Sequence, residues 1–315
     1  MIRSLWDFTV PKTGMLAFDY IWKKDLQTKV CCSSLLQSRK LKPLPPGPSQ
    51  VQAIPGSQMS RNSGAIKQVP TQQIPWVHTS RETFPSGEII GGHEVKPHSR
   101  PYMAYLMIWD QMSLKRCGGF LIREDFVLTA AHCWGSSINV TLGAHNIKEQ
   151  ERTQQIILVK RAIPHPAYNP ENFSNDIMLL QLERKAKRTT AVKPLRLPRN
   201  KAQVKPGQVC DVAGWGQTTP EGKYSHTLQE VKLTVEEDQT CKSRLRHYYD
   251  STVELCVGDP EIQKASFKGD SGGPLVCNKV AQGIVSYGRN NGKPPRVCTK
   301  VSSFVRWIKK TMKRH

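Results

Sequence analysis

From residue 89 onward, the chain consists of short apolar runs separated by turn residues. Many of these runs are β-branched or alternate between apolar and polar positions, and Gly, Pro and Asn stand between them. This pattern is typical of an all-β sandwich or barrel. Ten runs carry it: 102–108, 119–122, 126–129, 138–142, 156–159, 177–182, 209–213, 228–235, 274–277 and 281–285.

The last segment has a different period and predicts the one convincing helix of the chain. Over residues 303–312 the apolar side chains fall on one face of a helix, and lysines surround that face. The apolar positions are Phe304, Trp307, Ile308 and Met312.

The composition changes near residue 88. Residues 40–88 are rich in Pro, Ser and Gln and hold few large apolar side chains. Such a segment buries too little apolar area to offset the entropy of ordering it, so we expect residues 1–88 to be a largely disordered extension. Charged residues interrupt every candidate apolar core within residues 1–30, so no signal peptide is recognisable. No apolar run reaches 18 residues, and we expect no membrane-spanning helix.

The net charge of the chain predicts a class of binding partner. Lys and Arg total 46 against 25 acidic residues, which gives a net charge of +21. This balance predicts attraction to polyanions such as nucleic acid, anionic lipid or sulfated glycan. No motif for sequence-specific nucleic-acid binding is present.

Three short motifs carry candidate chemistry. Residues 269–274 read Gly-Asp-Ser-Gly-Gly-Pro, in which glycines let a substrate carbonyl approach the backbone N–H groups beside Ser271. Alone, such a segment is more often a turn. His132 stands in Leu-Thr-Ala-Ala-His-Cys, and Asp176 opens an apolar strand. A lone histidine or strand-start aspartate of this kind is usually structural, but a serine nucleophile needs both a base and a carboxylate that orients the base.

Their joint occurrence in the order His, Asp, Ser decides between these alternatives. With these motifs, residues 89–315 resemble the chymotrypsin family of serine peptidases and, within it, the granule proteases. The match begins with Ile-Ile-Gly-Gly at 89–92, includes Gly-Trp-Gly at 214–216 and Ser-Tyr-Gly at 286–288, and reaches the C-terminal helix. The resemblance implies two six-stranded antiparallel barrels, about 89–200 and 201–315, with the active site between them.

The resemblance also assigns roles. It implies a catalytic triad, an oxyanion hole, a strand edge that pairs with the substrate backbone, and an ion pair formed on activation. Cleavage between Glu88 and Ile89, after the dipeptide at 87–88, would free the α-amino group for this ion pair. The residues are His132, Asp176 and Ser271 for the triad, Gly269 and Ser271 for the oxyanion hole, Ser286, Tyr287 and Gly288 for the edge, and Ile89 with Asp270 for the ion pair.

The cysteines fit this family and an oxidising compartment. The resemblance implies three disulfides, Cys117–Cys133, Cys210–Cys277 and Cys241–Cys256, and leaves Cys298 as a buried core thiol. No spacing of ligands suggests zinc, so we expect neither a metal nor a cofactor.

Substrate choice depends on the pocket floor. Ala265 stands where trypsin-like members have Asp, so a basic substrate side chain would lack its partner. In granzymes a basic residue reaches into the pocket from the opposite wall, and the matching position here is Arg296. A guanidinium recognises carboxylate bidentately, which predicts cleavage after Asp. The alternative is that Arg296 is a surface residue after a Pro-Pro turn.

We therefore expect a monomeric serine endopeptidase that cleaves proteins after Asp and acts in cytotoxic killing and apoptosis. The resemblance implies a secreted or cytolytic-granule protein, with acidic proteoglycan as a partner. The sequons at Asn139 and Asn172 permit N-glycosylation. Two alternatives are a catalytically silent binding protein of this fold, against which the intact triad argues, and a polyanion-binding protein.

Overall fold

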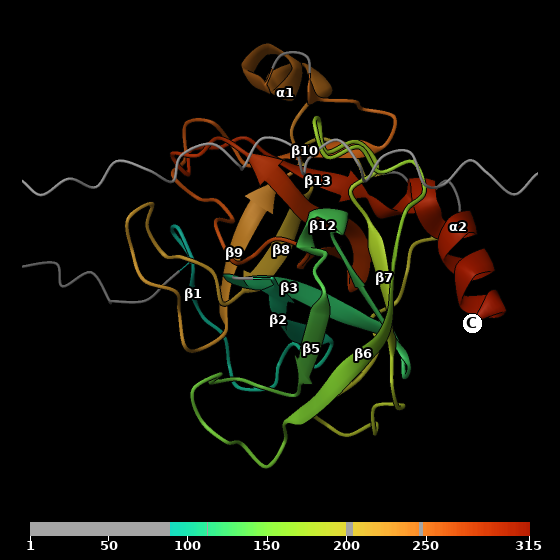
Figure 1. Cartoon of the computed structure of the whole chain (residues 1–315). Helices are drawn as coiled ribbons and strands as arrows, with labels where there is room; N and C mark the ends of the chain where they lie inside the picture. Colours follow the sequence, from blue (N-terminus) through green and yellow to red (C-terminus); the bar gives the residue numbers. More distant parts are fainter. Residues whose placement is uncertain (1–88, 112, 200–203, 246–247) are drawn as a thin grey trace, which may run out of the picture. The chain divides into compact units, whose positions relative to one another are not determined.

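The computed structural model describes residues 89–315 except 112, 200–203 and 246–247. The predicted disordered extension and its activation dipeptide lie outside these described residues. Within them, strands dominate, and β1 to β13 are joined by one 3₁₀ turn and two helices (Figure 1). The all-β prediction is confirmed.

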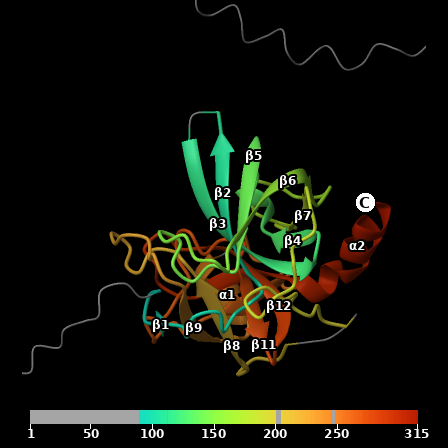
Figure 2. The ribbon, with the colours of Figure 1, turned by 90° about the horizontal axis from the view of Figure 1, so that it is seen from below.

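The first barrel is a closed, antiparallel sheet of six strands in the order β2-β3-β4-β7-β6-β5. Pairing of β2 with β5 closes it, and Figure 2 shows β2 between β3 and β5. Its interior is fully buried and apolar, for example at Leu106, Phe120 and Leu179. The strands are β2 (Met103–Asp110), β3 (Ser113–Arg123), β4 (Phe126–Thr129), β5 (Ser137–Leu142), β6 (Gln155–Pro164) and β7 (Met178–Leu182).

The second sheet has seven strands in the order β1-β9-β8-β11-β12-β13-β10. Strand β1 is the addition to the six that were expected, and it pairs with β9. An isolated bridge pairs Val235, just after β9, with Val257 at the end of β10. It connects β9 and β10, which are not neighbours in the strand order of the sheet. The strands are β1 (His93–Glu94), β8 (Val209–Gly214), β9 (Gln229–Thr234), β10 (Glu254–Val257), β11 (Pro274–Cys277), β12 (Val280–Gly288) and β13 (Arg296–Lys300).

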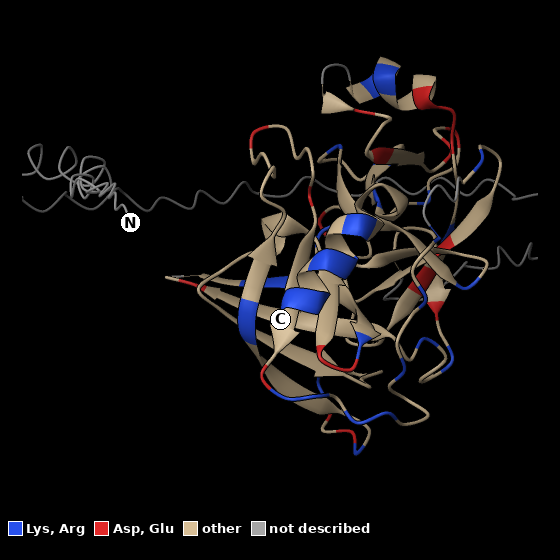
Figure 3. Ribbon diagram, turned by 90° about the vertical axis from the view of Figure 1, so that its right-hand side faces the viewer, with Lys and Arg blue, Asp and Glu red and all other residues tan. Residues whose placement is uncertain are grey.

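The predicted C-terminal helix is α2 (Val301–Arg314), which extends the expected range by two residues at each end. Phe304 and Ile308 are buried in one apolar cluster with residues of the first barrel. Figure 3 shows basic bands along the opposite side of α2. No helix of the described residues is long and apolar enough to cross a membrane.

Helix α1 (Asp238–Leu245) was not predicted. Only Cys241 of its residues is buried, so the helix has no apolar stripe for a periodicity argument to detect. Its disulfide with Cys256 attaches it to β10. The structure forms the three pairs that the family resemblance implies, and the other two are Cys117–Cys133 and Cys210–Cys277.

Candidate active site

His132 and Ser271 are brought to one place by strand β3. His132 lies in the 3₁₀ turn Ala131–Cys133 after β4, and Cys133 is bonded to Cys117 of β3. The next residue of β3, Gly118, donates its N–H to the carbonyl oxygen of Ser271 at 2.8 Å. His132 and Ser271 therefore line the same cleft, which has a volume of about 400 Å³.

Asp176 lies behind the imidazole and is completely buried. Its carboxylate accepts the backbone N–H of His132 at 2.9 Å and is 2.7 Å from the imidazole Nδ1. The hydroxyl of Ser286 donates to the same carboxylate at 2.5 Å. A carboxylate has only acceptors, so in the neutral imidazole the proton is on Nδ1 and the lone pair is on Nε2. This arrangement is what a general base needs.

The loop around Ser271 depends on glycine. Gly269 has a φ of +98°, and a Cβ there would lie 2.8 Å from the Tyr224 ring and 2.9 Å from the Cα of Gly216. No acceptor among the described residues takes the N–H of Gly269 or of Ser271. Two unpaired backbone donors beside a serine suit a developing negative charge on oxygen.

Asp270, next to Ser271, is a second completely buried carboxyl group. It accepts the N–H of Phe267 at 2.8 Å and of Gly216 at 2.9 Å. Among the described residues, no Lys, Arg or His forms an ion pair with it. Burial therefore raises the pKa of Asp270 to about 7, because desolvation outweighs the two backbone bonds.

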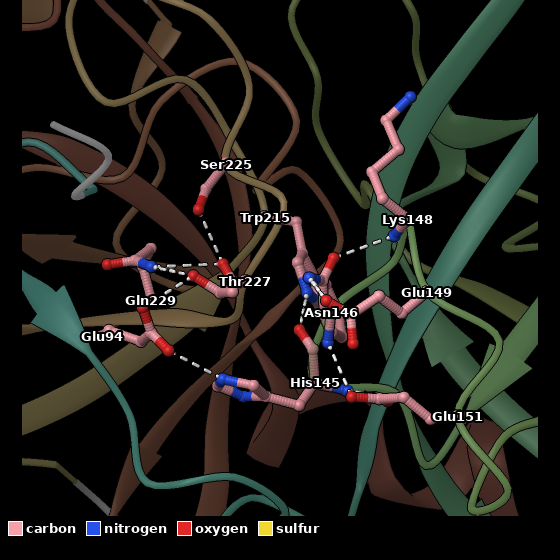
Figure 4. A network of polar contacts seen from close by, with 10 residues as sticks. All are labelled: Glu94, His145, Asn146, Lys148, Glu149, Glu151, Trp215, Ser225, Thr227 and Gln229. Atoms are coloured by element: carbon pink, nitrogen blue, oxygen red, sulfur yellow. Dashed lines mark hydrogen bonds and ion pairs between the residues drawn. The ribbon is translucent and has the colours of Figure 1, made fainter.

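Ile89 is buried in the core of the second sheet, in one cluster with Val212 and Leu233. The segment that follows it is held by the network in Figure 4. Glu94 of β1 accepts His145 Nε2 at 2.8 Å and the Thr227 hydroxyl at 2.9 Å. These bonds lower the pKa of Glu94, the one from His145 most strongly.

His145 extends the same network toward Asp270. Its carbonyl oxygen accepts the Trp215 indole N–H at 3.0 Å, and Trp215 precedes the Gly216 that donates to Asp270. The network thus connects β1 with a loop of the first barrel and with the segment beside Asp270.

Arg296 lines the cleft and is only 7% exposed, so the alternative of a surface residue is wrong. Its Nη1 donates to the Arg289 carbonyl at 2.8 Å, and its buried Nε has no partner among the described residues. Burial lowers its pKa. Gly288 makes room for it, since a Cβ there would lie 2.6 to 2.7 Å from the guanidinium.

Comparison with known proteins agrees with this geometry. The model of the family described as Trypsin matches residues 89–308. The chain belongs to the trypsin family of serine proteases. Human granzyme B is 87% identical over 73% of this chain and 93% of its own length, and human granzyme H is 69% identical over 72% and 92%. A solved structure described as "Structure of GrC" has a TM-score of 0.70 and 62% identity, and covers 71% of this chain and all of its own.

Other residues that the sequence singled out are buried in the protease. Ala265 is buried and donates its N–H to the Ile90 carbonyl at 3.1 Å, and its role at the pocket floor stays a prediction. Cys298 is a buried thiol, as expected, and burial raises its pKa to about 12. Cys117, His132 and Cys133 lie close together, but the two sulfurs are bonded to each other and offer no thiolate.

Both sequons lie on described residues of the protease. Asn139 is in β5, and Asn172 accepts the Ser174 N–H at 3.1 Å. Their glycosylation stays a prediction.

Several residues that line the cleft were missed by sequence reasoning. Phe173 contacts His132 edge-on, with ring centroids 5.8 Å apart, and stacks on Tyr287 at 5.5 Å. The only signal in the sequence for Phe173 was its position three residues before Asp176. The others are Leu245, Tyr248, Phe267, Lys268, Arg289 and Asn290.

Proposed function

We propose that the protease hydrolyses proteins with Ser271 as nucleophile, His132 as general base and Asp176 as the residue that orients the base. One observation carries this proposal: buried Asp176 fixes the imidazole in the cleft that Ser271 also lines. The Ser271 oxygen attacks the substrate carbonyl carbon, and its proton passes to Nε2 of His132. The imidazolium then gives this proton to the leaving amine as the C–N bond breaks.

The acyl group left on Ser271 is released by water through the same steps. His132 takes a proton from water, the hydroxide attacks the acyl carbon, and Ser271 leaves as its oxygen regains the proton. The free N–H groups of Gly269 and Ser271 stabilise the oxyanion in both halves. The edge at Ser286, Tyr287 and Gly288 pairs with the substrate backbone as an added strand.

Arg296 gives this chemistry its preference for Asp. A substrate carboxylate entering the cleft would find the guanidinium whose Nε has no other partner, in a site with little water. Charge-assisted bonds are strong under these conditions.

Arg296→Gly tests this assignment. Loss of a desolvated charged partner costs on the order of 3–5 kcal/mol, so cleavage after Asp should fall more than about a hundredfold. The measurement is the cleavage profile on a peptide library. Arg306→Ala is the control, because this arginine is exposed on α2 and lies outside the cleft. A profile of Arg296→Gly that still favours Asp would refute the assignment.

Activation requires cleavage between Glu88 and Ile89. The new ammonium on Ile89 then pairs with Asp270, the buried carboxyl that lacks a cationic partner among the described residues. This pair holds the loop 269–271 so that its N–H groups point at the substrate.

The likeness to granzyme B also supports secretion into cytolytic granules and a role in killing target cells. Acidic proteoglycan is the partner that fits the charge. The exposed basic side chains of α2 support it, and these are Arg306, Lys309, Lys310, Lys313 and Arg314.

A further inference from the structure

Glu254 is a buried carboxyl group that the hydrolytic mechanism does not use. It lies at the start of β10, opposite Thr299 of β13, and is 2% exposed. Its Oε2 accepts the backbone N–H of Asp250 at 2.8 Å. The same oxygen is 3.1 Å from the hydroxyl of Tyr287, on the strand edge that pairs with substrate.

The Tyr287 hydroxyl has two neighbours that compete for one proton. It is 2.7 Å from the Tyr248 carbonyl oxygen and 3.1 Å from Glu254. A phenol has a single proton to donate. When Glu254 is ionised, both neighbours of the Tyr287 hydroxyl are acceptors, and one of them receives no hydrogen bond from it. When Glu254 is protonated, its O–H donates to the Tyr287 oxygen, and Tyr287 donates to Tyr248, so all groups are satisfied.

This competition reaches the cleft directly. Tyr248 and Tyr287 both line it. Tyr287 stacks on Phe173 with an interplanar angle of 25°, and Phe173 contacts His132 at 88°. A change in how Tyr248 is held therefore changes one wall of the substrate site without touching Ser271.

We propose that Glu254 is a positioning residue. Its protonation state determines whether the Tyr287 hydroxyl holds the Tyr248 carbonyl, and so whether the wall of the cleft that Tyr248 forms is fixed. The inference rests on the proposed proteolysis. Protonation fixes the wall and favours substrates long enough to reach it, and ionisation releases the Tyr248 carbonyl and weakens their binding.

The surroundings of Glu254 place this change of protonation near neutral pH. Burial is the main cause and raises the pKa of Glu254 to about 7. The carboxylates of Asp250 and Asp176 raise it further, while the bonds from the Asp250 N–H and from Tyr287 lower it. On β13, Thr299 is neutral and the Lys300 ammonium donates to the Ser251 carbonyl. Burial and then Asp238 raise the pKa of the Tyr249 phenol, and the Glu254 charge raises it further. Glu254 is therefore protonated below about pH 7 and ionised above it.

The test compares two substrates of the activated protease at pH 6 and pH 8. One is an acetylated tetrapeptide amide ending in Asp, and the other is a single acetylated Asp with the same leaving group. Both substrates use the same triad and the same pocket, so the ratio of their KM values cancels effects of pH that act on both substrates alike. We expect the ratio of the tetrapeptide KM to the single-residue KM to rise about fivefold from pH 6 to pH 8, as for the loss of one neutral hydrogen bond.

Glu254→Gln should abolish this rise. Its amide does not titrate in this range, so the ratio should be the same at pH 6 and at pH 8. Glu236→Gln is the matched control, because burial also raises the pKa of this carboxyl group, which lies outside the cleft. It should keep the wild-type rise. A wild-type ratio that does not change with pH, or a Glu254→Gln ratio that rises as in the wild type, would overturn the proposal.

A second measurement does not depend on the variant or on activity. In wild-type protein with ¹³C-labelled Glu carboxyls, one resonance should titrate near pH 7. A set of Glu resonances that all titrate below about pH 5 would overturn the proposal. Failure of the proteolysis itself would appear differently, as no hydrolysis of either substrate at either pH.

Discussion

Three buried carboxyl groups of this protease have different surroundings, because each has a different set of hydrogen-bond donors. Asp176 is contacted by two N–H groups of His132 and by the Ser286 hydroxyl, a donor set that suits the ionised form. Asp270 has two backbone donors, and Glu254 has one backbone donor and a shared phenol. Burial raises the pKa of these two to about 7. Motifs pointed to Asp176 and Asp270, whereas no local pattern marked Glu254, whose environment comes from three separate segments.

A methyl group at position 288 should disturb substrate choice. In Gly288→Ala the new Cβ would lie within 2.7 Å of the Arg296 guanidinium, which must move. Displacing a charged hydrogen-bond donor costs about 1.5–3 kcal/mol, so kcat/KM for an Asp peptide should fall roughly 10- to 100-fold. Gly207→Ala strains the backbone, since Gly207 has a φ of +83°, but its Cβ meets nothing within 4 Å and it lies outside the cleft, so kcat/KM should stay unchanged. An Asp peptide cleaved equally well by both variants would show that Gly288 does not shape the pocket.

At the scale of elements, the sequence predicted strands well where apolar runs were dense. All ten runs overlap strands of the structure, and α2 was found from its apolar face. The missed elements have physical reasons. Strand β1 is two residues long and exposed. Strands β10, Glu-Leu-Cys-Val, and β13, Arg-Val-Cys-Thr-Lys, hold polar residues in buried positions, and the Thr299 hydroxyl donates to the Asp176 carbonyl 123 residues away. The pattern of apolar runs gave no sign that Arg296 is inside; the family resemblance placed it in the pocket, and the fold shows it to be 7% exposed.

Helix α2 should contribute strongly to stability through its buried face. Ile308 is fully buried against the first barrel's core, so Ile308→Ala should lower the free energy of unfolding by about 2–5 kcal/mol. Lys309→Ala, on the exposed side, should change it by less than about 0.5 kcal/mol. Urea unfolding of the protease measures both. Equal midpoints for the two variants would mean that the helix packing described here contributes little.

At the scale of the whole molecule, the site combines residues far apart in sequence. His132 and Asp176 belong to the first barrel and its connections, and Ser271 precedes β11 of the second sheet. Motifs identified the three residues, but their contacts with Phe173, Ser286 and Tyr287 required the fold. The boundary at residue 88 stays a prediction, because the extension lies outside the described residues.

Cleavage at Ile89 should change both activity and the pH dependence of stability. In the uncut chain, the pKa of Asp270 is about 7 in the folded state, against 3.8 for an ordinary aspartate carboxyl. A raised folded pKa gives stability that is present below about pH 4 and is lost as pH rises through 7. Between pH 5 and pH 8 the loss should be about 2–3 kcal/mol. Pairing with the Ile89 ammonium lowers the Asp270 pKa and removes this loss.

Urea unfolding at the two pH values compares the full chain with a version that starts at Ile89. Glu254 titrates in both chains, so their difference reports mainly the pairing of Ile89 with Asp270. The full chain, verified intact by mass, should also be inactive on an Asp peptide. Equal activity, or the same pH dependence of stability in both chains, would contradict the activation scheme.

The central claim is hydrolysis after Asp by Ser271, and the most direct measurement is mass-spectrometric mapping of the bonds cut in a protein substrate. The chain starting at Ile89 should cut after Asp. Its Ser271→Ala variant should retain at most the 10³–10⁴-fold acceleration over water that a site without its triad provides. Cleavage by Ser271→Ala near the wild-type rate, or wild-type cuts without Asp before the broken bond, would contradict the account.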